Sequence, residues 1–247
     1  MGTHRTRFLA FAMALAVLPA LAAPVPKLTF GCDATWPPME FLDKGKNIVG
    51  FDIDMIKAAA QAAGFEAEVK NTAWDGIFAG LAAGDYDAVL SAVTITDERA
   101  RTMDFSVPYL DAGQVLVVKK ATEGVTRLEQ FGGKKVGAQI GTTGAIEVAK
   151  HKDIKLKSYD EVGLAVEDLY VGRIDAVVVD KPTAITYVLQ NDKYKGSLKI
   201  VGDSFTDEHY GVAIKKGNQK TLDLVNKGLS TIIQDGTLAK IADKWLK

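Results

Sequence analysis

The feature that most constrains the fold is an order of strands and helices that the sequence predicts twice. In the first half of the chain, strand and helix patterns alternate over 28–32, 54–64, 65–69, 75–83 and 86–91. In the second half, they alternate over 135–140, 144–151, 154–159, 161–171 and 174–179. The third strands of the two series also resemble each other, as Gly84-Asp-Tyr-Asp-Ala-Val-Leu90 and Gly172-Arg-Ile-Asp-Ala-Val-Val178. Such alternation predicts right-handed crossovers and mostly parallel sheets, and its repetition favours two similar α/β lobes over one continuous sheet.

The first residues have the pattern of a secretory signal. The chain opens with His4, Arg5 and Arg7 and no acid, continues with an apolar run from Phe8, and reaches small residues at 20–23. This run falls short of the ~20 residues that a spanning helix needs, which disfavours an uncleaved anchor. We therefore expect residues 1–22 to be a signal peptide cleaved near Ala22/Ala23, and the product to be periplasmic.

Charge and cysteine content exclude several classes of protein. The formal net charge is −1, and removal of the predicted signal leaves 28 basic and 31 acidic residues, so no nucleic-acid or anionic-membrane partner is indicated. The single cysteine, Cys32, excludes a disulfide within the chain and is expected to be a small buried group. No cluster with metal-ligand spacing and no cofactor motif is visible, so neither a metal nor a cofactor is expected.

Polar side chains follow the predicted strands at the points where these strands end. Ligands of open α/β sheets bind at the carboxyl ends of the strands, so a site is expected there. The side chains at these ends are Asp33, Ser91, Thr142, Thr143 and Asp180.

Two tryptophans belong to the same strand ends. Trp36 lies in a stiff loop with two prolines after Asp33, and Trp74 follows the second strand. They could flank a flat or cationic side chain, although each could equally be part of the core. The alternative role for Asp33 is structural, namely to cap the turn in this loop.

The segment 91–99 is the richest in polar groups. Its hydroxyls, including Thr94, and its free backbone groups stand at a strand end, and Asp97 is expected to cap a short helix. Arg99 then falls in the first turn, where a cation opposes the helix dipole and needs an anionic partner. That partner is either a ligand carboxylate or, as the alternative, Asp97 or Asp104.

In the second half, Gly141-Thr-Thr-Gly144 joins a strand to a helix and offers backbone N–H groups to an anion. Asp180 precedes Pro182 and could instead cap the following helix. Arg99 and the Thr143 amide together could hold a carboxylate, while Asp180, Thr94 and the Ala92 carbonyl could hold an ammonium group. Asp33 then remains for the far end of a ligand, and this set of groups fits a zwitterion with a side chain.

Over residues 27–247 the chain resembles the polar-amino-acid periplasmic binding proteins of ABC importers. Five motifs in the order of that family carry the resemblance, namely Gly50-Phe-Asp-Ile-Asp54, Thr94-Ile-Thr-Asp-Glu-Arg99, Asp104-Phe-Ser-Val-Pro-Tyr109, Gly141-Thr-Thr-Gly144 and Tyr210-Gly-Val-Ala-Ile-Lys215. The resemblance implies the two-lobed type II periplasmic-binding-protein fold. It places lobe 1 at 27–109 plus 210–247, lobe 2 at 114–205, and the hinge at 109–114 and 205–210.

The resemblance also implies roles for single residues. Arg99 would pair with the α-carboxylate of a free L-amino acid, helped by amides at Thr94 and Thr143. Asp180, the Thr94 hydroxyl and the Ala92 carbonyl would hold the α-ammonium group. The remaining positions would surround the ligand side chain, with Trp36 and Trp74 as an aromatic pair and Asp33 facing its head. The implied partners are the amino acid and the membrane permease of the importer, and the protein itself is expected to be a monomer.

The identity of the amino acid is a further expectation. Asp33 disfavours glutamate and aspartate. Glutamine-specific members have a lysine and a histidine where this chain has Gln139 and Val179, whereas Gln139 followed by Thr142 looks more like arginine-binding members. The expected order is arginine, then lysine or histidine, then glutamine.

Two other functions are possible for this fold. Some dehydratases acting on a cyclohexadienyl acid share it, but a catalytic acid or base is not evident, because His151 and His209 stand at none of the predicted strand ends. A detached sensor domain is also possible, although the chain ends at Lys247 without a transmembrane or kinase-like extension.

Overall fold

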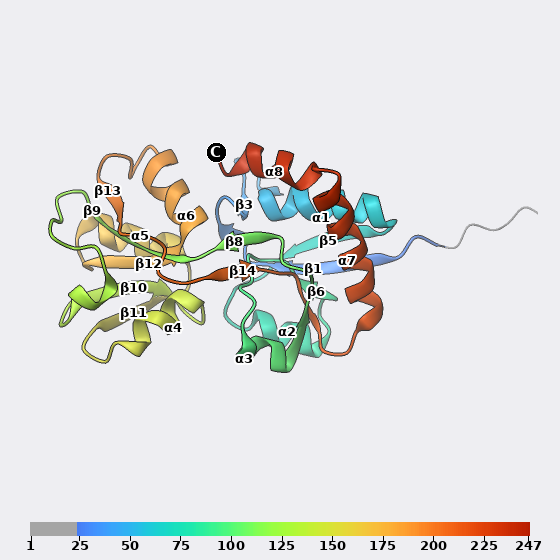
Figure 1. The fold of residues 1–247 in the computed structure, drawn as a ribbon, viewed down its shortest axis with the longest axis horizontal. Coiled ribbons are helices and arrows are strands. Elements are labelled where there is room, and N and C mark those ends of the chain that lie inside the picture. The colour runs from blue at the N-terminus through green and yellow to red at the C-terminus, as the bar shows by residue number, and fades with distance from the viewer. Residues whose placement is uncertain (1–23) are drawn as a thin grey trace, which may run out of the picture.

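The computed structural model describes residues 24–247, so the predicted signal peptide lies outside the described residues. Two groups of strands and helices lie side by side, and two extended segments cross between them (Figure 1). We call the group around β1 lobe 1 and the group around β10 lobe 2. Both are α/β, as the sequence predicts.

Lobe 1 is built on a five-stranded sheet of order β5-β1-β6-β15-β7. Its strands are β1 (Lys27–Cys32), β5 (Glu66–Asn71), β6 (Ala88–Val89), β7 (Met103–Phe105) and β15 (Ala213–Lys215). The first three in the sheet are parallel, whereas β15 is antiparallel to both β6 and β7. The C-terminal part of the chain therefore returns to complete the sheet of the N-terminal part.

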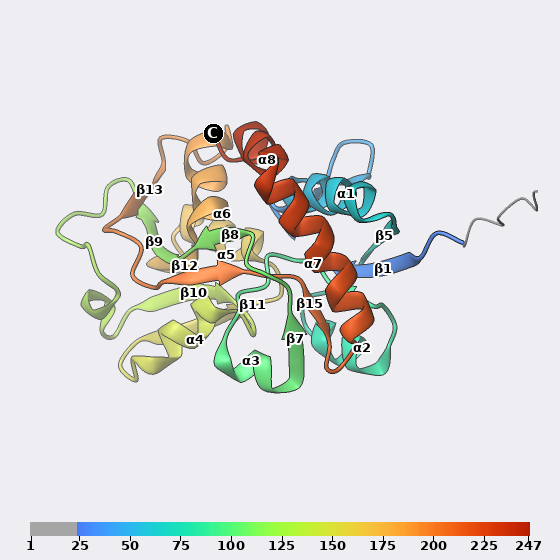
Figure 2. The same ribbon diagram turned by 45° about the vertical axis from the view of Figure 1, so that its right-hand side comes forward.

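The helices of lobe 1 cover both faces of this sheet (Figures 1 and 2). They are α1 (Phe51–Ala63), α2 (Ile77–Ala83), α3 (Asp97–Thr102), α7 (Gln219–Gln234) and α8 (Thr237–Trp245). A small antiparallel sheet before α1 contains β2 (Thr35–Trp36), β3 (Glu40–Leu42) and β4 (Ile48–Val49).

Lobe 2 repeats this arrangement with the order β11-β10-β12-β9-β13. Its strands are β9 (Gln114–Lys119), β10 (Lys135–Gln139), β11 (Lys155–Tyr159), β12 (Ala176–Asp180) and β13 (Leu198–Val201). Its helices are η1 (Leu128–Phe131), α4 (Thr143–Lys150), α5 (Val162–Val171), α6 (Lys181–Ile185) and the π-helical turn η2 (Thr186–Gln190). Again three parallel strands are followed by a strand antiparallel to them, β9, and β13 is in turn antiparallel to β9. The prediction of two similar α/β lobes is confirmed.

Two extended segments connect the lobes and pair with each other. They are β8 (Leu110–Ala112) and β14 (Glu208–Tyr210), which are antiparallel. Both cross between the lobes in Figure 1, β8 in green and β14 in orange-red.

The sequence echo has a structural cause. Gly84 and Gly172 each end a helix in the left-handed conformation, with φ of 91° and 84°, which glycine adopts without a steric penalty. Three residues later, the Asp87 carboxylate accepts a hydrogen bond from the Thr29 amide (2.7 Å), and the Asp175 carboxylate accepts one from the Lys135 amide (2.9 Å). In each lobe this aspartate joins the middle strand of the sheet to the neighbouring parallel strand.

Some local predictions differ from the structure. The strand predicted at 86–91 is reduced to β6, because the residues after Val89 leave the sheet to form a wall of the site described below. The cap predicted for α3 at Asp97 is wrong: Thr96 is the capping residue, and its hydroxyl accepts a hydrogen bond from the Arg99 amide (3.1 Å).

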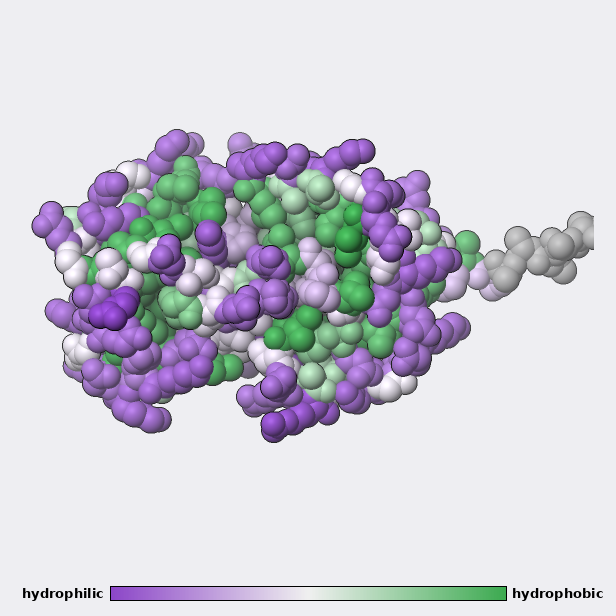
Figure 3. Space-filling view, in the orientation of Figure 1, coloured by the Kyte–Doolittle hydropathy of each residue, from purple (hydrophilic) through white to green (hydrophobic). Residues whose placement is uncertain are grey.

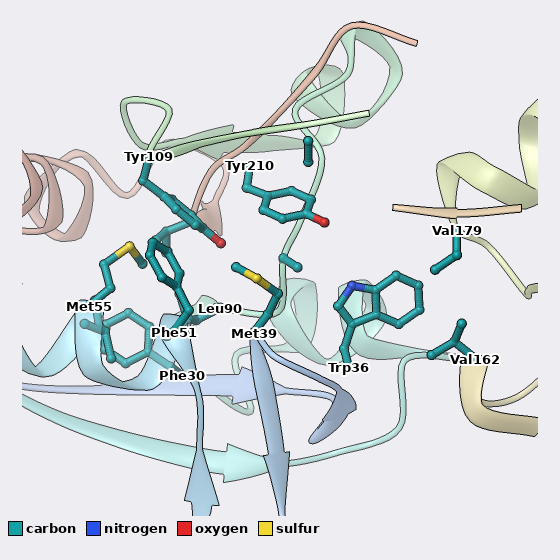
Figure 4. Close-up of a cluster of buried hydrophobic side chains, with 14 of the residues drawn as sticks. Phe30, Trp36, Met39, Phe51, Met55, Leu90, Tyr109, Val162, Val179 and Tyr210 are labelled. Carbon is teal, nitrogen blue, oxygen red and sulfur yellow. The ribbon is translucent and has the colours of Figure 1, made fainter. Parts of the chain in front are cut away.

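The hydrophobic core continues from one lobe to the other. Figure 4 shows Trp36 of lobe 1 beside Val162 and Val179 of lobe 2 in a cluster that also contains Tyr210. Trp36 is only 7% exposed and packs in this core, which is one of the two environments that the sequence allowed for it. Cys32 is fully buried, as expected. The lobes are thus in contact, and the conformation is closed.

Hydrophilic side chains form most of the outline of both lobes on the face shown in Figure 3. Within residues 24–247, no helix combines the length and the apolar character needed to cross a bilayer.

Candidate ligand-binding site

A small cavity lies between the two lobes. Its walls leave about 300 Å³ of space between atoms, part of which is open to solvent. All the residues that the sequence analysis singled out surround it, namely Asp33, Trp36, Trp74, Ser91, Ala92, Thr94, Arg99, Gln139, Thr142, Thr143 and Asp180. They come from the ends of parallel strands and from the helices that follow, where the topology predicts a ligand.

Arg99 reaches from α3 to the other lobe. Its Nη1 donates to the Thr94 carbonyl (2.9 Å), and its Nη2 donates to the Gly141 carbonyl of lobe 2 (3.2 Å). Neither acid considered as an intramolecular partner forms an ion pair with it among the described residues, and Asp104 is bound by Lys216 instead (2.9 Å). Partial burial lowers the pKa of Arg99, although Asp180 and Glu208 oppose this effect. The guanidinium, with five N–H donors, retains capacity to bind an anion in the cavity.

Trp74 has a role that differs from the expected one. The Arg99 guanidinium carbon lies 5.5 Å from the centre of the Trp74 ring and 5.2 Å from that of Phe78. These are cation–π distances, so Trp74 lines the cavity and also orients the arginine. Trp36 lines the same cavity and lies beside Val162 and Val179 of lobe 2 (Figure 4).

Asp180 ends β12 and carries the negative charge of lobe 2. Its carboxylate accepts hydrogen bonds from the Tyr210 hydroxyl (2.6 Å) and from the Gln114 amide nitrogen. Asp180 occupies the N-cap position of α6, as the alternative from the sequence has it, but its side chain makes no capping hydrogen bond and is directed to Tyr210 and Gln114 instead. Burial raises the pKa of Asp180 to about 6, the nearby Glu208 adds to the effect, and the two hydrogen bonds together with Arg99 reduce it. A cationic group in the cavity would favour the ionised form.

The start of α4 forms another part of the lobe 2 wall. Thr142 caps the helix, with its hydroxyl accepting from the Ala145 amide (3.3 Å). Thr143 occupies the first helical position and is buried. Free N–H groups and the positive end of the helix dipole lie at this point, which suits a carboxylate.

The far end of the cavity is formed by Asp33 and Gln139 from opposite lobes. Gln139 Nε2 donates to Asp33 Oδ2 (2.8 Å) and to the Asp160 carbonyl (2.8 Å), and the Asp33 amide donates to Ser91 Oγ (2.9 Å). Asp33 is only 4% exposed, and this burial raises its pKa despite the hydrogen bonds from Thr35 and Gln139. No cation binds the Asp33 carboxylate within the described part of the chain, so a positively charged ligand head would neutralise it.

Sequence analysis missed two polar residues beside the cavity. Glu208 of β14 accepts hydrogen bonds from the Thr94 hydroxyl (3.0 Å), the Thr143 hydroxyl (2.8 Å) and Gln114 Nε2 (3.2 Å). Gln114 lies directly opposite Asp180 in the β9–β12 register. Glu208 could have been predicted from the sequence. It lies two residues before Tyr210, which belongs to one of the five motifs, and residues two apart on a strand point to the same face. Gln114 depends on an antiparallel register that the sequence does not reveal.

The two histidines of the described residues, His151 and His209, lie outside this cavity. His209 is an exposed β14 residue whose Nδ1 is 2.9 Å from an Asp111 oxygen, and His151 follows α4. Among residues 24–247, no group of three or more potential ligands is placed to hold a metal ion.

The fold and the cavity define a two-lobed binding protein in a closed conformation, with a guanidinium in one wall and a carboxylate in the other. Residues 28–247 match the model of the bacterial extracellular solute-binding proteins, family 3, and the chain belongs to this family.

Several known proteins are similar to this chain over most of their own length. The L-cystine-binding protein TcyJ of Escherichia coli (strain K12) is 36% identical over 220 residues, 88% of this chain and 82% of that protein. A probable histidine-binding protein of Neisseria gonorrhoeae is 37% identical over 216 residues, 86% of this chain and 80% of the relative. A solved structure of an ancestral arginine-binding protein bound to arginine is 43% identical, with a TM-score of 0.84 and coverage of 90% of this chain and 98% of that one.

Proposed function

We propose that this protein captures one free L-amino acid between its lobes and delivers it to the permease of an ABC importer. The observation that carries the proposal is the placement of Arg99 and Asp180 in opposite lobes around one cavity. The α-carboxylate would pair with Arg99 and the start of α4, and the α-ammonium group with Asp180, the Thr94 hydroxyl and the Ala92 carbonyl. A zwitterion satisfies both charges at once, whereas a ligand with one charge leaves the other buried and unpaired.

The ligand side chain would extend toward Asp33. A buried carboxylate without a cationic partner favours a guanidinium or ammonium head and disfavours an acidic one. We therefore place arginine first, followed by lysine or histidine, and glutamine after these. Similarity to an arginine-binding protein and to a probable histidine-binding protein supports this order, while similarity to TcyJ makes cystine a necessary competitor in any test.

Capture would depend on hinge closure. The proposed hinge segments are 109–114 and 205–210, which contain β8 and β14. The closed form contains hydrogen bonds between the lobes, from Arg99 to Gly141 and from Gln139 to Asp33. Opening of the hinge would break these bonds. A ligand that bridges both walls would shift the population toward this closed form. The permease would then recognise the closed monomer.

The remaining parts of the proposal concern location and chemistry. Residues 1–22 would direct export to the periplasm and be removed near Ala22/Ala23. We infer that the protein is not an enzyme, because a bound zwitterion with a basic side chain would account for the charged groups of the cavity, and no histidine of residues 24–247 lines it.

A thermal-shift screen of the twenty amino acids and cystine tests the proposal. A ligand that binds only the folded protein adds about 2.7 kcal/mol to the unfolding free energy when its free concentration is a hundred times its dissociation constant. We expect the largest shift with arginine and smaller shifts with lysine or histidine. If no amino acid raises the midpoint, the proposed function is wrong, and a shift with cystine alone would overturn the assignment of a basic ligand. Incubation with prephenate or arogenate and product analysis would test the enzymatic alternative.

A further inference from the structure

Two carboxyl groups lie inside lobe 1, directly behind the wall of the cavity. Glu40 of β3 and Asp52 of α1 both have no exposed surface. They do not line the cavity themselves. Within residues 24–247, neither forms a salt bridge. Such a pair requires a physical explanation, because an isolated buried carboxylate is costly.

The hydrogen bonds of this pair lead to the cavity wall. Glu40 Oε1 accepts from the Ser91 hydroxyl (2.9 Å), and Asp52 Oδ2 accepts from the Ala92 amide (2.9 Å) and the Tyr109 hydroxyl (2.9 Å). The second oxygens, Glu40 Oε2 and Asp52 Oδ1, are buried without any other partner. The Asp52 amide donates to the carbonyl of Met39, the neighbour of Glu40 (2.9 Å), so the two carboxyl groups start from adjacent backbone, and each affects the pKa of the other. A proton between them would satisfy both remaining oxygens.

The charges around the pair permit only one negative charge on it. The other titratable groups that face it are Cys32, Asp33, Tyr109 and Tyr210, and none of them is a cation. Burial and the charge of Asp52 hold the pKa of Glu40 well above its ordinary value, while burial raises that of Asp52 to about 6. Two buried carboxylates with no cation beside them are disfavoured, and the higher pKa of Glu40 makes it the group that holds a proton more tightly.

The backbone held by this pair is strained. Ala92 has φ of 47°, in the left-handed region that a residue with a side chain rarely adopts. Its amide is bound by Asp52, and the hydroxyl of the preceding Ser91 is bound by Glu40. Both residues line the cavity, where the Ala92 carbonyl is assigned to the ligand ammonium group. The pair thus anchors the turn from two sides.

We propose that Glu40 and Asp52 share one proton and act as positioning residues that hold the Ser91–Ala92 turn in its ligand-binding conformation. Glu40 donates the shared proton to Asp52 and accepts a hydrogen bond from Ser91, so the side chain at position 40 must supply both a donor and an acceptor. Asp52 remains an acceptor only, for Ala92, Tyr109 and Glu40. The part of the inference that concerns ligands rests on the proposed function, but the shared proton does not.

Infrared spectroscopy of the whole protein at pH 8 tests the shared proton without any ligand. A protonated carboxyl group has a carbonyl stretch that a carboxylate lacks, and at this pH Asp180 is ionised. We expect such a band in the unaltered protein and its loss in Glu40→Gln. Absence of the band, or its persistence in Glu40→Gln, would overturn the proposal. If the band behaves as expected and no amino acid binds, only the proposed function has failed.

Calorimetry of amino-acid binding separates positioning from simple packing. Glu40→Gln keeps a donor toward Asp52 and an acceptor for Ser91, so we expect an affinity within about threefold of the unaltered protein. Glu40→Met has similar size but neither group, and we expect at least a tenfold loss that Glu40→Gln does not show. Equal losses in the two variants would contradict the proposal. If Glu40→Met does not fold, the infrared comparison of the unaltered protein with Glu40→Gln still decides.

Discussion

The two walls of the cavity are built in different ways. The lobe 1 wall stands on the core of its own lobe: Asp52 and Glu40 anchor the turn at 91–92, and the rings of Trp74 and Phe78 orient Arg99. The principal charge of lobe 2 is held in part by a crossing segment, because Asp180 is bound by Tyr210 of β14 as well as by Gln114 at the start of β9. We infer that lobe 1 offers a preformed half-site, whereas the lobe 2 half-site is coupled to the hinge through Tyr210.

This difference suggests how binding and closure are linked. A ligand could first meet the rigid wall of lobe 1, where the guanidinium and the aromatic rings are already in place. Its ammonium group would then pair with an acid whose neighbours lie on the hinge, so that neutralisation of Asp180 favours the closed arrangement. If the comparison is correct, changes in lobe 1 should mainly affect affinity, and changes at Asp180 should affect both affinity and its dependence on pH.

The largest effect is expected for Arg99→Ala. Truncating one member of a buried, hydrogen-bonded charge pair costs about 2–5 kcal/mol, so affinity for every amino acid should fall by roughly thirty-fold or more. Titration calorimetry measures the loss, and Arg101→Ala is the matched control, because Arg101 is an exposed residue of the same helix. Affinity within threefold of the unaltered protein in Arg99→Ala would remove the carboxylate-binding role of lobe 1.

Asp180→Asn should have a somewhat smaller effect that depends on pH. With a pKa of about 6, Asp180 is ionised at pH 8 and pairs with the ligand ammonium group. Loss of this charge-assisted bond should cost about 1.5–3 kcal/mol at pH 8. Below pH 6 the unaltered protein must give up a proton to bind, so its affinity advantage over the variant should decline about tenfold per pH unit. Calorimetry from pH 5 to 8 measures this ratio.

The same substitution makes a prediction for the ligand-free protein. Because the folded-state pKa of Asp180 is raised above its ordinary 3.8, the favourable contribution of its proton is present at acid pH and is lost as pH rises through about 6. The stability of Asp180→Asn relative to the unaltered protein should therefore increase between about pH 4 and pH 6 and stay constant at higher pH, while its binding is weaker. Asp192→Asn, an exposed change in the same lobe, should show neither effect. A pH-independent stability difference would mean that Asp180 is not the titrating group.

The contrast between the walls also marks the limit of what the sequence could predict. Asp33, Arg99, Thr143 and Asp180 were identifiable because parallel strands end at one edge of a sheet, which local patterns indicate. Glu40 gave no such signal, since its role depends on the close approach of β3 to α1. Register across antiparallel strands and contacts between distant elements are fixed by packing, which a single sequence does not display.

Helix caps show the same limit on a smaller scale. Asp97 and Thr96 are both good capping residues, and the sequence alone does not decide between neighbours. The structure selects Thr96, whose hydroxyl binds the Arg99 amide. The helix therefore begins one residue earlier than a cap at Asp97 would allow, which affects where its arginine points.

The smallest and most selective effect is expected for Asp33→Asn. The structure can accommodate the amide, because its oxygen can take the place of Asp33 Oδ2 and accept from Gln139 Nε2, which keeps its bond to the Asp160 carbonyl. The new NH2 group then faces the Thr35 hydroxyl, which can rotate to accept from it. The variant thus loses the charge at the far end of the cavity with little change in shape. Affinity for arginine and lysine should fall about tenfold, and affinity for glutamine should change less than threefold.

Calorimetry with arginine, lysine and glutamine measures this selectivity directly. The charge of Asp33 matters only for the ligand side chain, because the groups common to all amino acids would be held by Arg99 and Asp180. An equal loss for all three ligands would show that Asp33 supports the lobe 1 wall through its hydrogen bonds and does not select the side chain. A loss confined to the two basic amino acids would instead assign selection to lobe 1, whose preformed wall is the part of the site best able to discriminate before the lobes close.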